Sequence, residues 1–244
     1  MEKIFDENEW VEKIKNPLWY EGVPFMVRKM FVLKEQDDKQ YRIEREHIYQ
    51  FFENQLALGN VSLGETGKNF DNERKGIDTI VIHHTYGDIE MTKERLSVME
   101  LLRLYATFFA DPTYEADKEI KGQPIFSGHF REGKQVFYPY HWIIRKNGEF
   151  EQLLFDNEIG WHAGNWEVNC RSVAIVFDNN FENSSPSKIE IESAAKLIKE
   201  KYPNVPKERI FGHREINTKT TCPSNLFLQE GDKKGWKEDL LNLL

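Results

Sequence analysis

The chain has 244 residues, enough for one domain with an extension or for one domain and a smaller second one. Hydrophobic residues make up 39% and charged residues 30%, which supports a sizeable core under a solvated surface and excludes a disordered or fibrous protein. The net charge of −8 disfavours a broad electrostatic interface with nucleic acid, and we expect no nucleic-acid partner.

The N-terminus is acidic and lacks the apolar run of a signal peptide. No stretch approaches the ~18 apolar residues that a transmembrane helix needs. The sequence therefore predicts a protein made in the cytoplasm, which either stays there or reaches an external substrate after release.

Residues 1–75 differ in pattern from the rest and are expected to form a separate α+β extension. Apolar residues at helical spacing predict helices over residues 9–14 and 45–58. Residues 24–33 are expected to form a strand between them. Residues 59–76 carry Gly, Asn, Ser and charge, which is typical of a linker or long loop.

Strands and helices alternate from residue 77 onward, which indicates an α/β domain over 76–244. We expect strands at 78–83, 137–145, 149–155, 172–178 and 209–212, and helices at 95–110, 185–201 and 235–244. Asn147-Gly148 lies between two strand patterns and predicts a hairpin, because both residues tolerate positive φ. Residues 111–135 are polar, contain several Gly and Pro residues, and are expected to form an insertion loop.

Two of the seven histidines follow expected strands closely, and a cysteine comes soon after the second. His83 ends the apolar run 80–82, His213 follows the strand at 209–212, and Cys222 comes nine residues later. Two imidazoles and a thiolate suit zinc, and three protein ligands leave a position for a water molecule that can attack a carbonyl. A lone histidine at a strand end is more often a packed residue, and a single Cys170–Cys222 disulfide is an alternative outside the cell. Spacing alone therefore leaves the metal site open.

Seven short segments together carry a family resemblance. They are Ile-His-His-Thr at 82–85, Tyr-His-Trp-Ile-Ile at 140–144, Asn-Gly at 147–148, Trp-His-Ala-Gly at 161–164, Ser-Val-Ala-Ile at 172–175, Gly-His-Arg-Glu at 212–215 and Cys-Pro at 222–223. In this order they resemble the N-acetylmuramoyl-L-alanine amidase family, which includes phage lysozyme-type amidases and peptidoglycan recognition proteins. The resemblance covers roughly residues 76–230 and implies a central mixed sheet flanked by helices.

The resemblance implies a role for each matching residue. Zn²⁺ would be bound by His83, His213 and Cys222. Tyr140 and Thr220 would stabilise the reacting carbonyl oxygen, with Lys219 as an alternative to Thr220. His162 and Asn169 match positions that line the substrate groove, and Trp161, next to His162, is expected either in the core or stacked on substrate. His84 and His141 are expected to have structural roles.

The implied function is hydrolysis of the amide bond between N-acetylmuramic acid and L-alanine, with peptidoglycan or a muropeptide as the partner. Two alternatives stay open. One is a non-catalytic recognition module, which usually lacks the cysteine ligand. The other is an amidase of soluble muropeptides, where Asp typically replaces Cys222 and Glu replaces Val176. The lack of a signal peptide fits a phage endolysin or an intracellular enzyme, whereas the oligomeric state and the role of residues 1–75 do not follow from the sequence.

Overall fold

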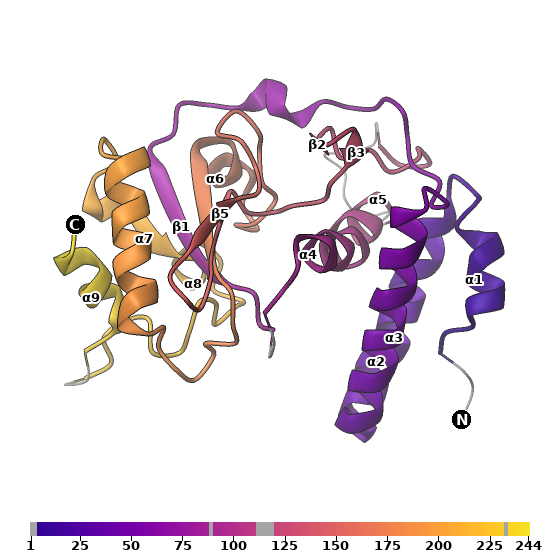
Figure 1. Cartoon of the computed structure of the whole chain (residues 1–244), viewed down its shortest axis with the longest axis horizontal. Coiled ribbons are helices and arrows are strands. Elements are labelled where there is room, and N and C mark those ends of the chain that lie inside the picture. Colours follow the sequence, from indigo (N-terminus) through magenta and orange to yellow (C-terminus); the bar gives the residue numbers. More distant parts are fainter. Residues whose placement is uncertain (1–3, 88–89, 111–119, 232–233) are drawn as a thin grey trace. The chain divides into compact units, whose positions relative to one another are not determined.

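The computed structural model describes residues 4–87, 90–110, 120–231 and 234–244 (Figure 1). The chain divides into two compact units, with Met1–Asn69 and Thr92–Phe137 in unit 1 and Phe70–Met91 and Tyr138–Leu244 in unit 2. The structure thus groups residues 92–137 with the N-terminal helices, whereas the sequence analysis assigned them to a domain over 76–244.

Unit 1 is mainly helical. Its elements are α1 (Glu7–Lys13), a 3₁₀ turn (Trp19–Gly22), α2 (Val23–Gln36), α3 (Asp38–Ala57), α4 (Lys93–Glu100), a π-helical turn (Leu101–Tyr105), α5 (Ala106–Ala110), and the strands β2 (Phe130–Arg131) and β3 (Lys134–Gln135). Its core is rich in aromatic rings: Trp10 and Trp19 both pack on Phe52, with ring centroids 5.6 and 5.4 Å apart. The helix expected at 95–110 is confirmed as the run from α4 to α5.

The strand expected at residues 24–33 is wrong, because this segment lies inside helix α2. The buried residues of α2 are Val23, Met26, Met30 and Leu33, three or four positions apart, so they form one helical face. Pro24 stands in the first turn of the helix, where its missing N–H costs nothing. The region expected to be α+β is therefore helical over its described residues.

The expected insertion at 111–135 is only partly described, since residues 111–119 lie outside the described residues. Strands β2 and β3 form a small antiparallel hairpin in the rest of it. The side chain of Gln135, in strand β3, donates to the Gly64 carbonyl at 2.8 Å and accepts from the Ser127 amide at 2.9 Å. The insertion thus contains regular structure tied to the preceding loop of unit 1.

Unit 2 is built on a five-stranded mixed sheet with the order β5-β4-β6-β1-β7. Its strands are β1 (Thr79–His84), β4 (Trp142–Ile144), β5 (Phe150–Gln152), β6 (Ser172–Phe177) and β7 (Ile210–Gly212). Its helices are α6 (Trp166–Arg171), α7 (Lys188–Lys201), α8 (His213–Ile216) and α9 (Trp236–Asn242), with 3₁₀ turns at Phe70–Glu73 and Lys207–Arg209. Strands β4, β6, β1 and β7 are parallel, and β5 is antiparallel to β4. The mixed sheet flanked by helices is confirmed.

Alternation along β1 and β6 gives the sheet two different faces. Ile80 and Ile82 of β1 share one face with Val173 and Ile175 of β6, and this face packs on helices α7 and α9 (Figure 1). Val81 points to the other face and packs with residues of α6 and α8. His83, two residues after Val81, therefore lies on the α6 side of the sheet.

Two local features explain the extent of β4. The hairpin expected at Asn147-Gly148 joins β4 to β5, and Gly148 has a φ of +85°. Strand β4 begins only at Trp142, later than expected, because the ring of His141 replaces a backbone group in the ladder. Its Nδ1 accepts from the Ala174 amide at 3.1 Å, and its Nε2 donates to the Glu158 carbonyl at 3.0 Å.

No helix in the described part of the chain combines the length and the apolar character that crossing a bilayer requires.

Candidate metal centre

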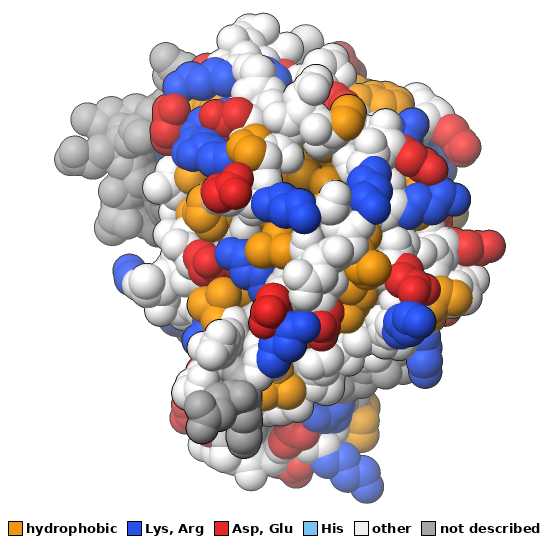
Figure 2. Space-filling model, turned by 90° about the vertical axis from the view of Figure 1, so that its left-hand side faces the viewer, with side chains coloured by type: hydrophobic (Ala, Val, Ile, Leu, Met, Phe, Trp, Pro, Cys, Tyr) orange, Lys and Arg blue, Asp and Glu red, His pale blue; other side chains and the backbone are white. Residues whose placement is uncertain are grey.

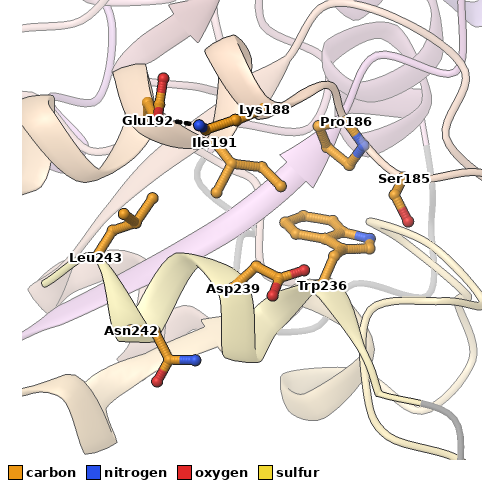
Figure 3. A pocket seen from close by; sticks show the side chains of 9 residues that line it. All are labelled: Ser185, Pro186, Lys188, Ile191, Glu192, Trp236, Asp239, Asn242 and Leu243. Carbon is orange, nitrogen blue, oxygen red and sulfur yellow. Dashed lines mark ion pairs between the residues drawn. The ribbon is translucent and has the colours of Figure 1, made fainter.

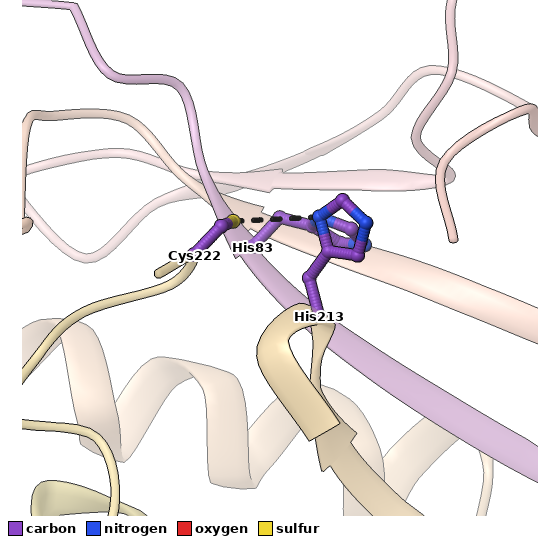
Figure 4. A group of neighbouring side chains, drawn as sticks. All are labelled: His83, His213 and Cys222. Carbon is purple, nitrogen blue, oxygen red and sulfur yellow. Dashed lines mark hydrogen bonds between the residues drawn. The ribbon is translucent and has the colours of Figure 1, made fainter. Parts of the chain in front are cut away.

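Three potential metal ligands from separate segments of unit 2 meet beside the sheet. His83 is the penultimate residue of β1, His213 is the first residue of α8, and Cys222 lies in the loop that follows α8. Their ligand atoms all lie within 4.8 Å of one another (Figure 4). The structure thus brings together the three residues for which the sequence predicts a metal site.

The sheet register explains why the two histidines are neighbours. Strand β7 pairs with β1 in parallel, with Ile82 opposite Gly212, so the next residues, His83 and His213, leave adjacent strands side by side. Gly212 is required at this position because a Cβ atom there would lie 2.5 Å from the ring of Phe227. The imidazole rings of His83 and His213 have centroids 4.7 Å apart.

The atoms that face one another are two ring nitrogens and a sulfur. Nδ1 of His83 lies 3.6 Å from Sγ of Cys222. Nε2 of His213 is buried and has no hydrogen-bond partner among the described residues. A buried nitrogen without a partner is costly in a folded protein, and a metal ion would satisfy it. Two imidazole nitrogens and one thiol sulfur form a donor set typical of zinc.

Burial keeps both histidines neutral, which is the form that binds metal. It lowers the pKa of His83 well below its ordinary value, and the neighbouring His213 adds to the effect. Burial lowers the pKa of His213 to about 4. Burial raises the pKa of the Cys222 thiol to about 12, whereas a backbone hydrogen bond at His84 acts in the opposite direction. A cation at this place would counter the cost of forming the thiolate.

A buried chain of hydrogen bonds runs from His83 away from the cluster. Nε2 of His83 lies 3.0 Å from Nδ1 of His162, and Nε2 of His162 lies 3.1 Å from Oγ of Ser172. If Nδ1 of His83 binds a metal, its Nε2 carries the proton and donates to His162, which then donates to Ser172. This chain fixes both the ring orientation and the tautomer of His83.

His162 and Asn169 were expected to line the substrate groove. Both side chains are buried in the structure. The Asn169 Oδ1 accepts from the backbone amides of His162 at 3.3 Å and Ala163 at 2.9 Å, so it holds the loop that carries His162. Their contacts point to positioning of His83, and a role in substrate binding stays a prediction.

Two of the three expected catalytic residues lie at the cluster, and the third lies at the surface. The ring centroid of Tyr140 is 5.0 Å from that of His83. The Thr220 hydroxyl accepts from the Cys222 amide at 3.1 Å, which ties Thr220 to the ligand loop. Lys219 is exposed, and its backbone amide donates to Asn217. The structure therefore places Tyr140 and Thr220 at the cluster and Lys219 at the surface.

Trp161 belongs to an aromatic cluster next to this loop. It is half-buried, with ring centroids 5.0 Å from Phe70 and 6.5 Å from Trp166. Trp166 donates its indole N–H to Glu73 at 2.7 Å. This arrangement supports the packing role that the sequence left open for Trp161, and stacking on substrate stays a prediction.

The remaining polar residues near the cluster have structural contacts. Nδ1 of His84 accepts from the Phe181 amide at 2.9 Å, and His141 bonds across the sheet as described above. Cys170 and Cys222 are both free thiols, so the disulfide alternative is not realised. The contact of Ser172 with His162 was not predicted from the sequence. The signal for it is a polar side chain at the start of an otherwise apolar, buried strand.

A cavity of about 480 Å³ lies elsewhere in unit 2, between helices α7 and α9 (Figure 3). Its floor includes Ile191 and Trp236, and Lys188 at its rim pairs with Glu192 at 3.5 Å. Figure 2 shows that Lys and Arg side chains are interspersed with Asp and Glu on the side of the molecule where these helices lie. No histidine or cysteine lines the cavity, and α7 and α9 cover the sheet face opposite His83. This cavity is therefore separate from the histidine–cysteine cluster.

Comparison with known proteins connects this cluster to a family. Residues 72–225, more than half of the chain, match the family model described as N-acetylmuramoyl-L-alanine amidase. The 1,6-anhydro-N-acetylmuramyl-L-alanine amidase AmpD of Haemophilus influenzae is 29% identical over 107 residues, which cover 41% of this chain and 58% of that protein. Peptidoglycan-recognition protein SD of Drosophila melanogaster is 26% identical over 117 residues, 46% of this chain and 62% of that protein. The chain thus spans about 60% of the length of these relatives.

Among solved structures, the N-acetylmuramoyl-L-alanine amidase LysC from Clostridium intestinale URNW is similar with a TM-score of 0.46 and 20% identity, over 74% of this chain and 94% of that one. All three candidate ligands lie inside the segment that matches the family model. The chain belongs to the N-acetylmuramoyl-L-alanine amidase family.

Proposed function

We propose that this protein hydrolyses the amide bond between N-acetylmuramic acid and L-alanine in peptidoglycan. The observation that carries the proposal is the convergence of His83, His213 and Cys222 within the family segment. Membership of the family gives the reaction class, and the cluster gives a place at which an amide carbonyl could be activated.

Zinc fits the donor set of this cluster. His83, His213 and Cys222 would hold it. Nε2 of His213, which is buried and has no hydrogen-bond partner in the described part of the chain, is the atom that most clearly calls for a cation. Bound zinc would supply a Lewis acid that polarises the scissile carbonyl and lowers the pKa of the attacking water. His162 and Ser172 would keep Nδ1 of His83 directed at the metal.

Tyr140 and Thr220 are proposed to stabilise negative charge on the carbonyl oxygen during attack. A hydroxyl has one donor hydrogen and two acceptor lone pairs. The Thr220 oxygen already accepts from Cys222, so its hydrogen remains available to donate toward substrate. The ring of Tyr140 packs beside His83, which brings its hydroxyl into the same neighbourhood. Lys219 is the alternative to Thr220, acting from the surface.

The two alternative functions are less well supported. A recognition module does not need a cysteine ligand, whereas Cys222 here lies with both histidines. An amidase of soluble muropeptides would typically carry Glu at Val176, which pairs with His83 in the sheet and is completely buried. No carboxylate occupies that position, so the intact wall is the proposed substrate, as for an endolysin.

The central test is digestion of purified peptidoglycan by the zinc-loaded protein, followed by mass spectrometry of the products. We expect free stem peptides that begin with L-alanine. The His213→Ala variant should release none above background, because the ligand set is broken. Binding of the wall without release of peptides by the wild-type protein would favour the recognition module. Unchanged hydrolysis by the variant would remove His213 from the site.

Cobalt substitution tests the thiol ligand without using activity. Co²⁺ bound through a thiolate gives an intense sulfur-to-cobalt absorption band, and we expect this band in the wild-type protein. The Cys222→Ser variant should lose it. Cys170→Ser removes the other buried free thiol and is the matched control, for which the band should persist. If Cys170→Ser loses the band and Cys222→Ser keeps it, the thiol ligand is Cys170 and not Cys222.

Metal affinity should depend on pH because one proton, that of the Cys222 thiol, must be lost when zinc binds. His213 has a pKa of about 4 and stays neutral near pH 7, whereas the Cys222 thiol has a pKa of about 12 and must lose its proton to bind. Zinc therefore competes with one proton, and its apparent affinity should rise about tenfold per pH unit between about pH 5 and 8. Competition with a chelator at several pH values measures this slope. A flat profile would exclude the thiol as a ligand.

Loss of one hydroxyl should slow the reaction without removing the metal. We expect Thr220→Val and Tyr140→Phe each to lower kcat about 100- to 1,000-fold, as for loss of an oxyanion donor. Thr220→Ser keeps the hydroxyl and should stay close to the wild-type rate. Zinc content measured in parallel should be unchanged in all three variants. A normal rate in Thr220→Val together with a slow Lys219→Met variant would transfer the role to Lys219.

A further inference from the structure

Tyr86 occupies a backbone conformation that its side chain disfavours. It follows β1 by two residues and has a φ of +59°, in the left-handed region that favours glycine. Among the described non-glycine residues, only Glu132 shares this feature, with a φ of +51°. Glu132 is an exposed polar residue in the turn between β2 and β3, where such a conformation is ordinary. An aromatic residue in the same conformation needs another explanation.

The surroundings of Tyr86 keep this conformation in place. The Thr85 hydroxyl accepts from the Gly87 amide at 3.3 Å, which closes the turn around Tyr86. On the far side of the loop, the Met91 amide donates to Asp178 at 3.0 Å. Asp178 also pairs with Arg145 at 2.5 Å, and both of these side chains are buried. The Thr85 hydroxyl also donates to Asp178 at 3.4 Å, so Thr85 and Met91, on either side of Tyr86 in the sequence, are both bonded to the residue that follows β6.

The ring of Tyr86 is exposed and packs on the residue that directly follows the ligand His83. It is 46% exposed, although it is a large and mostly apolar side chain. It packs edge-on against His84, the residue next to His83, with ring centroids 5.6 Å apart. The fold therefore holds an unfavourable conformation and exposes an aromatic ring three residues beyond the ligand His83. Both features suit a ligand contact.

We propose that Tyr86 is a substrate-binding residue, whose ring packs against a sugar of the glycan strand. This inference rests on the proposed function and names the contact that its substrate would make. A flat ring with a hydroxyl at its edge suits a pyranose, which has apolar C–H groups and polar hydroxyls.

The test compares Tyr86→Gly with Glu132→Gly. Both variants relieve a positive φ, so neither should unfold at a lower temperature than the wild type. Binding of a disaccharide muropeptide to zinc-loaded protein, measured by calorimetry on the slowly hydrolysing Thr220→Val background, should weaken about tenfold in Tyr86→Gly only. Tyr86→Phe keeps the ring and should bind within about threefold of the parent, whereas Tyr86→Asn tolerates the conformation but lacks the ring and should bind as poorly as Tyr86→Gly.

The outcomes separate this inference from the function on which it rests. A lower melting temperature with unchanged binding in Tyr86→Gly would make Tyr86 a packing residue and overturn the inference. An equal loss for the free stem peptide would overturn the assignment to the sugar. If wild-type protein binds the muropeptide but never cleaves it, the proposed function fails, whereas the binding comparison still decides the role of Tyr86.

Discussion

The parallel alignment of β1 with both β6 and β7 is the constraint on which the site depends. Parallel strands bring their carboxyl ends to one edge of a sheet, so residues that follow different strands meet there. His83 at the end of β1 and His213 just after β7 become neighbours through this register. Cys222, separated from His83 by 139 positions, completes the cluster from the loop after α8. A change of register by one residue would turn His83 to the opposite face of the sheet.

Burial at this edge has a cost that the hydrogen-bond chain only partly offsets. His83, His162 and Ser172 satisfy one another, whereas Nε2 of His213 has no partner among the described residues. An unsatisfied buried group costs about 1–3 kcal/mol. The cluster is therefore less favourable alone than with a cation, which links metal binding to the stability of unit 2. The same burial that keeps the imidazoles neutral makes the thiolate difficult to form without a metal.

The sequence predicted those parts of the molecule whose signals are local. Strands β1 and β6 follow from continuous apolar runs, and the β4–β5 hairpin follows from Asn147-Gly148. Helix α7 was expected at 185–201 and is observed at Lys188–Lys201, with Ser187 as its N-cap. The segment at 24–33 was assigned wrongly because a short apolar run fits both a strand and a buried helix face. The contacts of His162 with His83 and Ser172 could not be predicted, since they join residues 79 and 10 positions apart. The grouping of residues 92–137 with the N-terminal helices depends on tertiary packing in the same way.

The chain leaves unit 2 and returns to it at two points close in sequence to the site. It leaves after Met91, eight residues beyond His83, and returns at Tyr138, two residues before Tyr140. Residues next to both points are bonded to β6 or to the residue that follows it: the Met91 amide donates to Asp178, and the His141 amide donates to the Ala174 carbonyl at 3.0 Å. Hydrogen bonds inside unit 2 therefore hold the chain just before residue 92 and shortly after residue 137. His83 and the backbone next to Tyr140 are thus both held by the sheet of unit 2.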